Sequence, residues 1–179
     1  RALLVGVNYL GSAVELRNGR ADVADMLGFL HRVGFSADWT LSLTEDQADP
    51  ALRPTHRNIL TAMRWLTQGV APGDALFFHF SGHCAQQVDR GAAAGAVALD
   101  DAICPADFLE AGRITSNQIF ELLVRGLPSG VRLTVLMDCC LPCACLDLPF
   151  VCDPARGCWV GDPSPFHSLG DVVCFGADP

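Results

Sequence analysis

One stretch of sequence decides the fold of this chain: Leu133-Thr134-Val135-Leu136-Met137-Asp138-Cys139-Cys140. A short apolar run that ends abruptly in polar residues is typical of a strand buried in a sheet that helices cover on both faces. In such sheets, functional side chains follow the carboxyl ends of the strands. We therefore expect Asp138 and the cysteines after it to lie at a functional edge of the sheet.

A second apolar run has the same shape and ends in a histidine. Residues Ala75–Phe80 lead directly into Ser81-Gly82-His83. If the two strands are parallel neighbours, His83 and Cys140 meet above the same edge. Together they would form a dyad in which the thiolate is the nucleophile and the imidazole is the acid and base. The backbone amides of Cys140 and of Cys84, directly after the histidine, are suitably placed to bind the developing oxyanion.

The rest of the chain alternates between expected strands and helices. We expect strands at Ala2–Val7, Ala37–Leu43, Val97–Cys104 and Asp171–Phe175, and helices at Asp22–Arg32, at Thr55–Gln68 and from the capping box Thr115-x-x-Gln118 onward. This order predicts an α/β fold with a mostly parallel sheet and right-handed crossovers. Gly91–Gly95 should be a loop, and the Pro/Gly-rich Cys152–Gly170 an irregular connector.

The length and composition indicate one globular domain. The 179 residues can bury a substantial core, and a hydrophobic content of 50% argues against disorder. The net charge of -8 argues against a nucleic-acid partner, because phosphate binding needs a basic face. No apolar run reaches membrane-spanning length and no signal peptide is visible. We therefore expect a cytoplasmic monomer that does not bind a membrane.

The nine cysteines raise a metal-binding alternative. Secreted disulfide scaffolds are usually short and poor in long apolar runs, so we expect a reducing compartment and few disulfides. Zinc would need four ligands, which could come from the following set: Cys140-x-x-Cys143 with Cys145, Cys152, Cys158 or His83. A second CxxC motif at regular spacing is absent, which argues against a structural zinc module.

With these residues in hand, the chain resembles a type I metacaspase, a caspase-like cysteine peptidase of peptidase family C14 in clan CD. The resemblance rests on segments spread over nearly the whole chain: Arg1–Tyr9, Pro54–Leu66, Pro72–His83, Pro105–Phe108, Leu127–Thr134, Asp138–Cys140 and Leu146–Phe150. It implies a caspase-like three-layer sandwich with a mostly parallel central sheet and flanking helices. The family continues through a small-subunit region, which we expect to begin at Asp171–Pro179 and to be largely missing here.

The resemblance also implies an activity, namely cleavage of proteins or peptides after Arg or Lys without an organic cofactor. It assigns His83 as the acid and base and Cys140 as the nucleophile. The pocket for the basic side chain maps onto Asp22 and Asp138, with Ser81 beside them, and carboxylates in a cleft would pair with a guanidinium or ammonium. From the residues alone, Asp22 is better explained as a helix N-terminal acid and Asp138 as a loop cap.

Calcium stimulation is a further property that the resemblance implies. Calcium needs several hard oxygen ligands. Asp147 stands where the family places one, and Asp100, beyond the loop after the histidine, is a further candidate ligand. Where the family has a paired acid, however, this chain has Ser116-Asn117, and its acidic loop after the histidine is reduced to Ala92-Ala93-Ala94. We therefore expect weak calcium binding or none.

Other departures from the family pattern lie around the dyad. Cys84 stands where the family has a glycine, and its side chain would crowd an oxyanion donor or demand a different backbone angle. Leu141-Pro142-Cys143 replaces His-Ser-Gly after the nucleophile, and Arg20 would bring a positive charge near the acidic pocket. These changes support an alternative hypothesis, in which the chain is a catalytically impaired homologue that acts as a binding or regulatory module, or a degenerate fragment.

Overall fold

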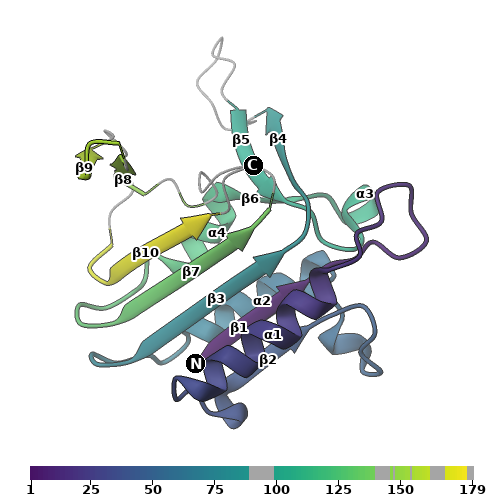
Figure 1. Ribbon diagram of the computed structural model, residues 1–179, viewed down its shortest axis with the longest axis horizontal. Helices are drawn as coiled ribbons and strands as arrows, with labels where there is room; N and C mark the ends of the chain where they lie inside the picture. Colours follow the sequence, from purple (N-terminus) through teal and green to yellow (C-terminus); the bar gives the residue numbers. More distant parts are fainter. Residues whose placement is uncertain (89–98, 140–145, 147, 154, 162–167, 177–179) are drawn as a thin grey trace.

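A parallel sheet forms the centre of the computed structural model, which describes residues 1–88, 99–139, 146, 148–153, 155–161 and 168–176. Within these ranges the sheet has five strands in the order β10-β7-β3-β1-β2, and every neighbouring pair is parallel (Figure 1). The strands are β1 (Ala2–Gly6), β2 (Thr40–Leu43), β3 (Ala75–Ser81), β7 (Arg132–Asp138) and β10 (Asp171–Gly176). The expected parallel sheet is confirmed, and β3 and β7 are neighbours at its centre.

Helices cover both faces of this sheet. The described helices are α1 (Gly19–Arg32), α2 (His56–Thr67), α3 (Phe108–Ala111) and α4 (Ser116–Leu123), with short 3-10 turns η1 (Ala37–Trp39) and η2 (Pro50–Leu52). One face is covered by α1, whose Val23 and Leu30 pack with Leu4 and Phe77. The opposite face is covered by α2 and α4 (Figure 1). This is the expected three-layer sandwich. None of the described helices is long and apolar enough to cross a bilayer.

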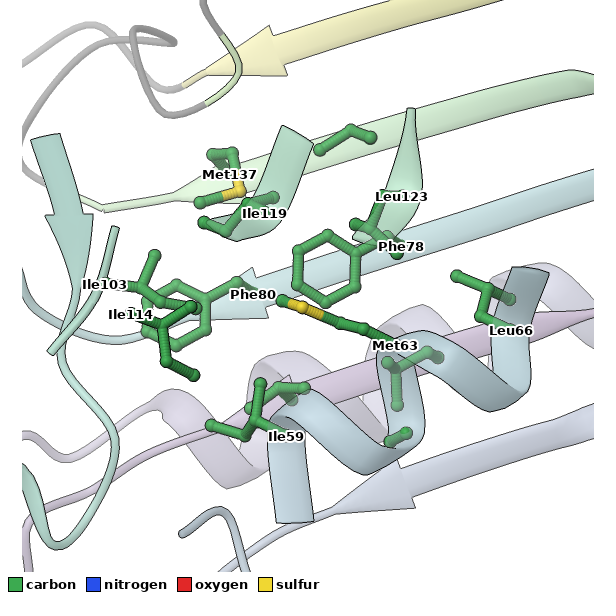
Figure 2. Packing of buried hydrophobic residues seen from close by; sticks show 14 of the residues in the cluster. Ile59, Met63, Leu66, Phe78, Phe80, Ile103, Ile114, Ile119, Leu123 and Met137 are labelled. Carbon is green, nitrogen blue, oxygen red and sulfur yellow. The ribbon is translucent and has the colours of Figure 1, made fainter. Parts of the chain in front are cut away.

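The larger core lies between the sheet and the α2/α4 pair. Figure 2 shows its members at close range: Ile59, Met63 and Leu66 from α2, Phe78 and Phe80 from β3, Ile119 and Leu123 from α4. On β3, these phenylalanines alternate with Phe77 and His79, which are buried beneath α1. Each fully buried aromatic or aliphatic side chain contributes about 1.5–3 kcal/mol. The central strand is therefore firmly held up to the point where the residues of the candidate site begin.

Capping side chains set the starts of two helices. The hydroxyl of Thr115 accepts a hydrogen bond from Gln118 N (3.2 Å), and Gln118 Oε1 accepts one from Thr115 N (3.1 Å), which confirms the predicted capping box. Similarly, α2 starts after Thr55, whose Oγ1 accepts from Asn58 N at 3.3 Å. The strand predicted at Ala37–Leu43 is shorter, because η1 occupies its first residues.

A β-hairpin replaces part of the irregular connector predicted at Cys152–Gly170. It consists of β8 (Phe150–Asp153) and the antiparallel β9 (Cys158–Gly161). The prediction was wrong here because the turn residues mark one hairpin turn rather than an irregular segment. Asp153 Oδ1 accepts from Ala155 N (2.9 Å) and Arg156 N (3.1 Å), and Gly157 follows with a φ of 63°.

A second, smaller sheet begins directly after His83. Its antiparallel strands are β4 (Cys84–Val88), β5 (Leu99–Ile103) and β6 (Ile114–Thr115). β5 falls within the predicted strand Val97–Cys104, whereas β4 was not predicted. The expected loop at Gly91–Gly95 lies outside the described residues. The sheet fixes the chain on the far side of the histidine, because Cys104 N donates to His83 O at 2.9 Å.

Candidate active site

The carboxyl ends of β3 and β7 meet at one edge of the central sheet. Ser81 and Asp138 are partners in the parallel register of these strands, and Gly82 N donates to Asp138 O at 3.3 Å. His83 follows β3 by two residues and Cys139 directly follows β7, where it is buried. Cys140, the expected nucleophile, lies outside the described residues. The strand ends that carry the two expected dyad residues are thus side by side (Figure 1).

His83 is held through both its backbone and its ring. Its N–H donates to Tyr9 Oη at 2.8 Å, and its Nε2 lies 2.9 Å from Val14 O. A carbonyl oxygen can only accept, so Nε2 must carry the hydrogen. In the neutral imidazole the other nitrogen, Nδ1, therefore has the lone pair that a general base needs. Neither Tyr9 nor Val14 was predicted as part of the site.

Asp22, Ser81 and Asp138 are brought together at the same edge. Ser81 Oγ donates to Asp22 Oδ2 at 2.8 Å, which links α1 to β3. Asp22 and Asp138 both line a cavity of about 490 Å³. The remaining described residues in its wall are Asp25, Met26, Phe29, His79, Leu136, Met137 and Gly176. Ser81 is not in this wall, so it holds a wall residue rather than forming the wall itself.

Asp22 influences the ionisation of its neighbour in the cavity, Asp138. The pKa of Asp138 lies above the usual value, first because of burial and then because of the neighbouring Asp22 and Cys139. Asp138 is nevertheless largely exposed, so water screens part of this effect. A cation entering the cavity would relieve the repulsion between the two carboxylates. The arrangement is therefore electrostatically suited to a positively charged side chain.

His79 adds a neutral group to the wall of the cavity. Its side chain is 2% exposed, and burial lowers its pKa to about 4, against a smaller opposing effect of Asp22. At neutral pH this imidazole is therefore uncharged and leaves the negative charge of the cavity intact. His79 is thus a buried residue of β3 that also lines the cavity.

Two departures from the family pattern have smaller consequences than expected. The guanidinium of Arg20 pairs with Asp46 at 3.3 Å and is not among the described residues of the cavity wall. The expectation that it would approach the pocket was wrong, because α1 begins at Gly19 and residues two apart in a helix face different sides. Cys84, the first residue of β4, does not have a positive φ. Among the described non-glycine residues, Tyr9 alone has one. The glycine it replaces is therefore not required by backbone geometry.

Of the two expected calcium ligands, Asp100 lies within the described residues. Asp100 is buried on β5, where Ser116 Oγ donates to its Oδ1 and Asn117 Nδ2 donates to its Oδ2 at 3.3 Å. The adjacent Asp101 has a buried, unpartnered Oδ1, but successive side chains of a strand point to opposite faces. Asp147 lies outside the described residues. Hydrogen-bond donors thus face both oxygens of Asp100, so a calcium ion would have to displace or turn these donors to reach this carboxylate.

The zinc alternative gains no support within the described ranges. No group of three or more His, Cys, Asp or Glu residues there is arranged to hold a metal ion. Cys152 pairs with Trp159 across the hairpin and Cys158 pairs with Asp153, so the two cysteines face opposite sides of it. Cys140, Cys143 and Cys145 lie outside the described residues.

Comparison with known proteins identifies the family. The family model described as "Metacaspase, peptidase C14 domain" matches residues 1–149. Metacaspase-5 of Trypanosoma brucei brucei is 41% identical over 98% of this chain and 36% of its own length. Metacaspase-1 of Mycosarcoma maydis is 42% identical over 84% of this chain and 37% of its own length. The chain thus spans little more than a third of these relatives.

A solved structure supports the fold. The crystal structure of protein GSU0716 from Geobacter sulfurreducens matches with a TM-score of 0.60 and 24% identity, over 78% of this chain and 49% of that one. This similarity concerns the arrangement of strands and helices. The family model and the identities with named metacaspases concern the sequence itself, and both include the β3 and β7 segments described above. The chain therefore belongs to the metacaspase family.

Proposed function

We propose that this chain is the catalytic part of a cysteine endopeptidase that cleaves proteins or peptides after Arg or Lys. The observation that carries the proposal is the pair of carboxylates, Asp22 and Asp138, in one cavity beside the strand ends that lead to His83 and Cys140. A long basic side chain would enter the cavity and pair with both carboxylates. Its own backbone would then lie near the edge where the nucleophile follows β7.

The proposed chemistry uses the dyad in two steps. His83 Nδ1 takes the proton of the Cys140 thiol, and the thiolate attacks the scissile carbonyl carbon. The same imidazole then protonates the leaving amine as the C–N bond breaks, leaving a thioester. A water molecule, deprotonated by His83, attacks the thioester and releases the acid and the thiol. The backbone amides of Cys140 and Cys84 would donate to the oxyanion formed in each step.

Substrates that differ in charge alone provide the first test. Two fluorogenic peptides should be compared, one with Arg at P1 and one with citrulline, which has nearly the same shape without the charge. We expect kcat/KM to be about 100-fold higher for Arg, since a hydrogen-bonded charge pair contributes about 1.5–3 kcal/mol. Equal cleavage of both peptides would contradict the proposed pocket. Absence of cleavage by folded protein that still binds the Arg peptide would favour a binding module.

We further propose that calcium is dispensable for this chain. In the described structure Asp100 is already satisfied by donors from Ser116 and Asn117, so no cation is needed to neutralise repulsion at this point. The double variant Ser116→Asp/Asn117→Asp replaces both donors with carboxylates. It should be less stable than the wild type without calcium and should regain stability when calcium binds.

Calorimetric titration and thermal unfolding with and without calcium provide the measurement. The wild type should release no binding heat and keep its Tm, whereas the double aspartate variant should bind calcium and unfold at a higher temperature in its presence. Ser116→Ala/Asn117→Ala is the matched control, because it removes the donors without adding charge. Calcium binding by the wild type, or none by the aspartate variant, would contradict the proposal.

A further inference from the structure

Tyr9 closes a ring of hydrogen bonds around the backbone of His83. Its hydroxyl accepts from His83 N (2.8 Å) and donates to Cys104 O (2.7 Å), and Cys104 N donates back to His83 O (2.9 Å). The side chain of Tyr9 is 3% exposed, and burial raises the pKa of its phenol. The hydroxyl therefore keeps its proton at every working pH and always donates to Cys104.

The ring of Tyr9 also restrains the imidazole of His83. The centroids of the two rings are 4.8 Å apart, with an interplanar angle of 32°. Phe108 packs edge-on against the Tyr9 ring, with the ring centroids 5.9 Å apart and an interplanar angle of 87°. One residue thus contacts His83 at its backbone and at its ring, while Val14 O binds Nε2.

Tyr9 is itself held in an unusual backbone conformation. Its φ is 55°, in the left-handed region that non-glycine residues rarely adopt and that persists only where the surroundings enforce it. The enforcing group is the carboxylate of Glu45, which accepts from Tyr9 N (2.9 Å), Leu10 N (3.1 Å) and Asn8 N. A single carboxylate at the end of β2 therefore holds the loop that carries Tyr9.

Gly82 permits the close approach between this loop and β3. A Cβ placed on Gly82 would lie 2.9 Å from Tyr9 Oη and 2.8 Å from Phe80 Cζ. Contacts this short would force the hydroxyl or the phenylalanine ring to move. The glycine before the histidine thus serves the tyrosine contact.

We propose that Tyr9, supported by Glu45, is the positioning residue of His83, keeping the Nε2–H bonded to Val14 and Nδ1 directed as the base. This inference rests on the proposed function for its catalytic consequence. The consequence is specific, because a displaced base slows proton transfer while the acidic cavity, formed by other elements, still binds the basic side chain.

The test compares Tyr9→Phe with Thr67→Val. The first substitution removes the hydroxyl and keeps the ring. The second removes a hydroxyl that donates to Leu122 O at 3.0 Å, between α2 and α4 and away from the site. We expect Tyr9→Phe to lower kcat about 10- to 100-fold with KM changed less than about twofold, and Thr67→Val to change neither. Glu45→Gln, which alters no core residue, should act in the same direction as Tyr9→Phe.

A spectroscopic measurement separates this inference from the proposed function. Long-range ¹⁵N–¹H correlation spectra report the tautomer of each histidine, and His83→Ala identifies the His83 signals. The wild type should show the Nε2–H tautomer of His83, and Tyr9→Phe or Glu45→Gln should shift it toward a mixture. If the wild type does not cleave peptides, the proposed function fails but the spectra still judge the role of Tyr9. Unchanged His83 signals in both variants would overturn the proposed role of Tyr9. If the enzyme is active, a kcat of Tyr9→Phe equal to that of Thr67→Val would also overturn this role.

Discussion

Replacing Cys140 with alanine is expected to abolish cleavage of the Arg peptide, lowering kcat/KM by about 10⁴-fold or more. The proposed mechanism forms its thioester on this sulfur, and the Cys140→Ala variant has no other group at that position. Binding should survive, because Asp22 and Asp138 line the cavity independently of the thiol. The variant should therefore still bind an Arg peptide inhibitor, measured by fluorescence anisotropy, while it shows no turnover.

Cys139 provides the matched control for this result. It directly precedes the proposed nucleophile and is buried at the end of β7. Cys139→Ser exchanges one sulfur for oxygen one residue away and should keep turnover within about threefold of the wild type, as expected for a residue outside the chemistry. If Cys139→Ser were inactive and Cys140→Ala active, the nucleophile would be Cys139 and the present assignment would be wrong.

Neutralising both pocket carboxylates should produce the second-largest effect. We expect Asp22→Asn/Asp138→Asn to lower kcat/KM for the Arg peptide by about 10²- to 10³-fold, because each charged hydrogen bond contributes about 1.5–3 kcal/mol and Asp138 is partly screened by water. Cleavage of the citrulline peptide should change little.

The measurement is the ratio of kcat/KM for the two peptides. The control is Asp46→Asn, which removes an exposed carboxylate that pairs with Arg20. A ratio unchanged in the double variant would rule out these carboxylates as the pocket.

The same carboxylates predict the direction of a pH effect. The pKa of Asp138 is raised by burial first and by Asp22 second. The attraction for a basic side chain is therefore present above this raised pKa and is lost as the pH falls through it. Asp22→Asn removes the repelling charge, so the pKa of Asp138 should fall and the acidic limb of kcat/KM should move to lower pH. Movement to higher pH would contradict this coupling.

The sequence predicted the parts of the fold that depend on side-chain pattern. The apolar run at Leu133–Met137 forms β7, and the capping box at Thr115 starts α4. Asp22 and Asp138, assigned to a pocket only through the family resemblance, line the same cavity. The strand and the helix start could be predicted because burial and capping leave recognisable residue types at fixed spacing.

The features that the sequence did not predict depend on long-range backbone contacts. Val14 O binds His83 Nε2, and a carbonyl is the same in every residue, so no residue type marks it. The role of Tyr9 could not be predicted from the sequence, because its contacts with His83 and Cys104 join distant parts of the chain. β4 was missed because its sequence, Cys84–Val88, lacks regular apolar alternation.

The strand order of the central sheet has a consequence for how the protein is made. β3 lies between β1, at the amino end of the chain, and β7, which is synthesised long afterwards. During translation β1 and β3 can pair while the residues of β7 have yet to leave the ribosome, and parallel pairing over such separations is slow. The register that sets Ser81 opposite Asp138 therefore forms late. We expect the nascent chain to pass through a stage in which its amino-terminal half is compact but the cavity lined by Asp22 and Asp138 has not yet formed, so the proposed activity would arise only after β7 has been made.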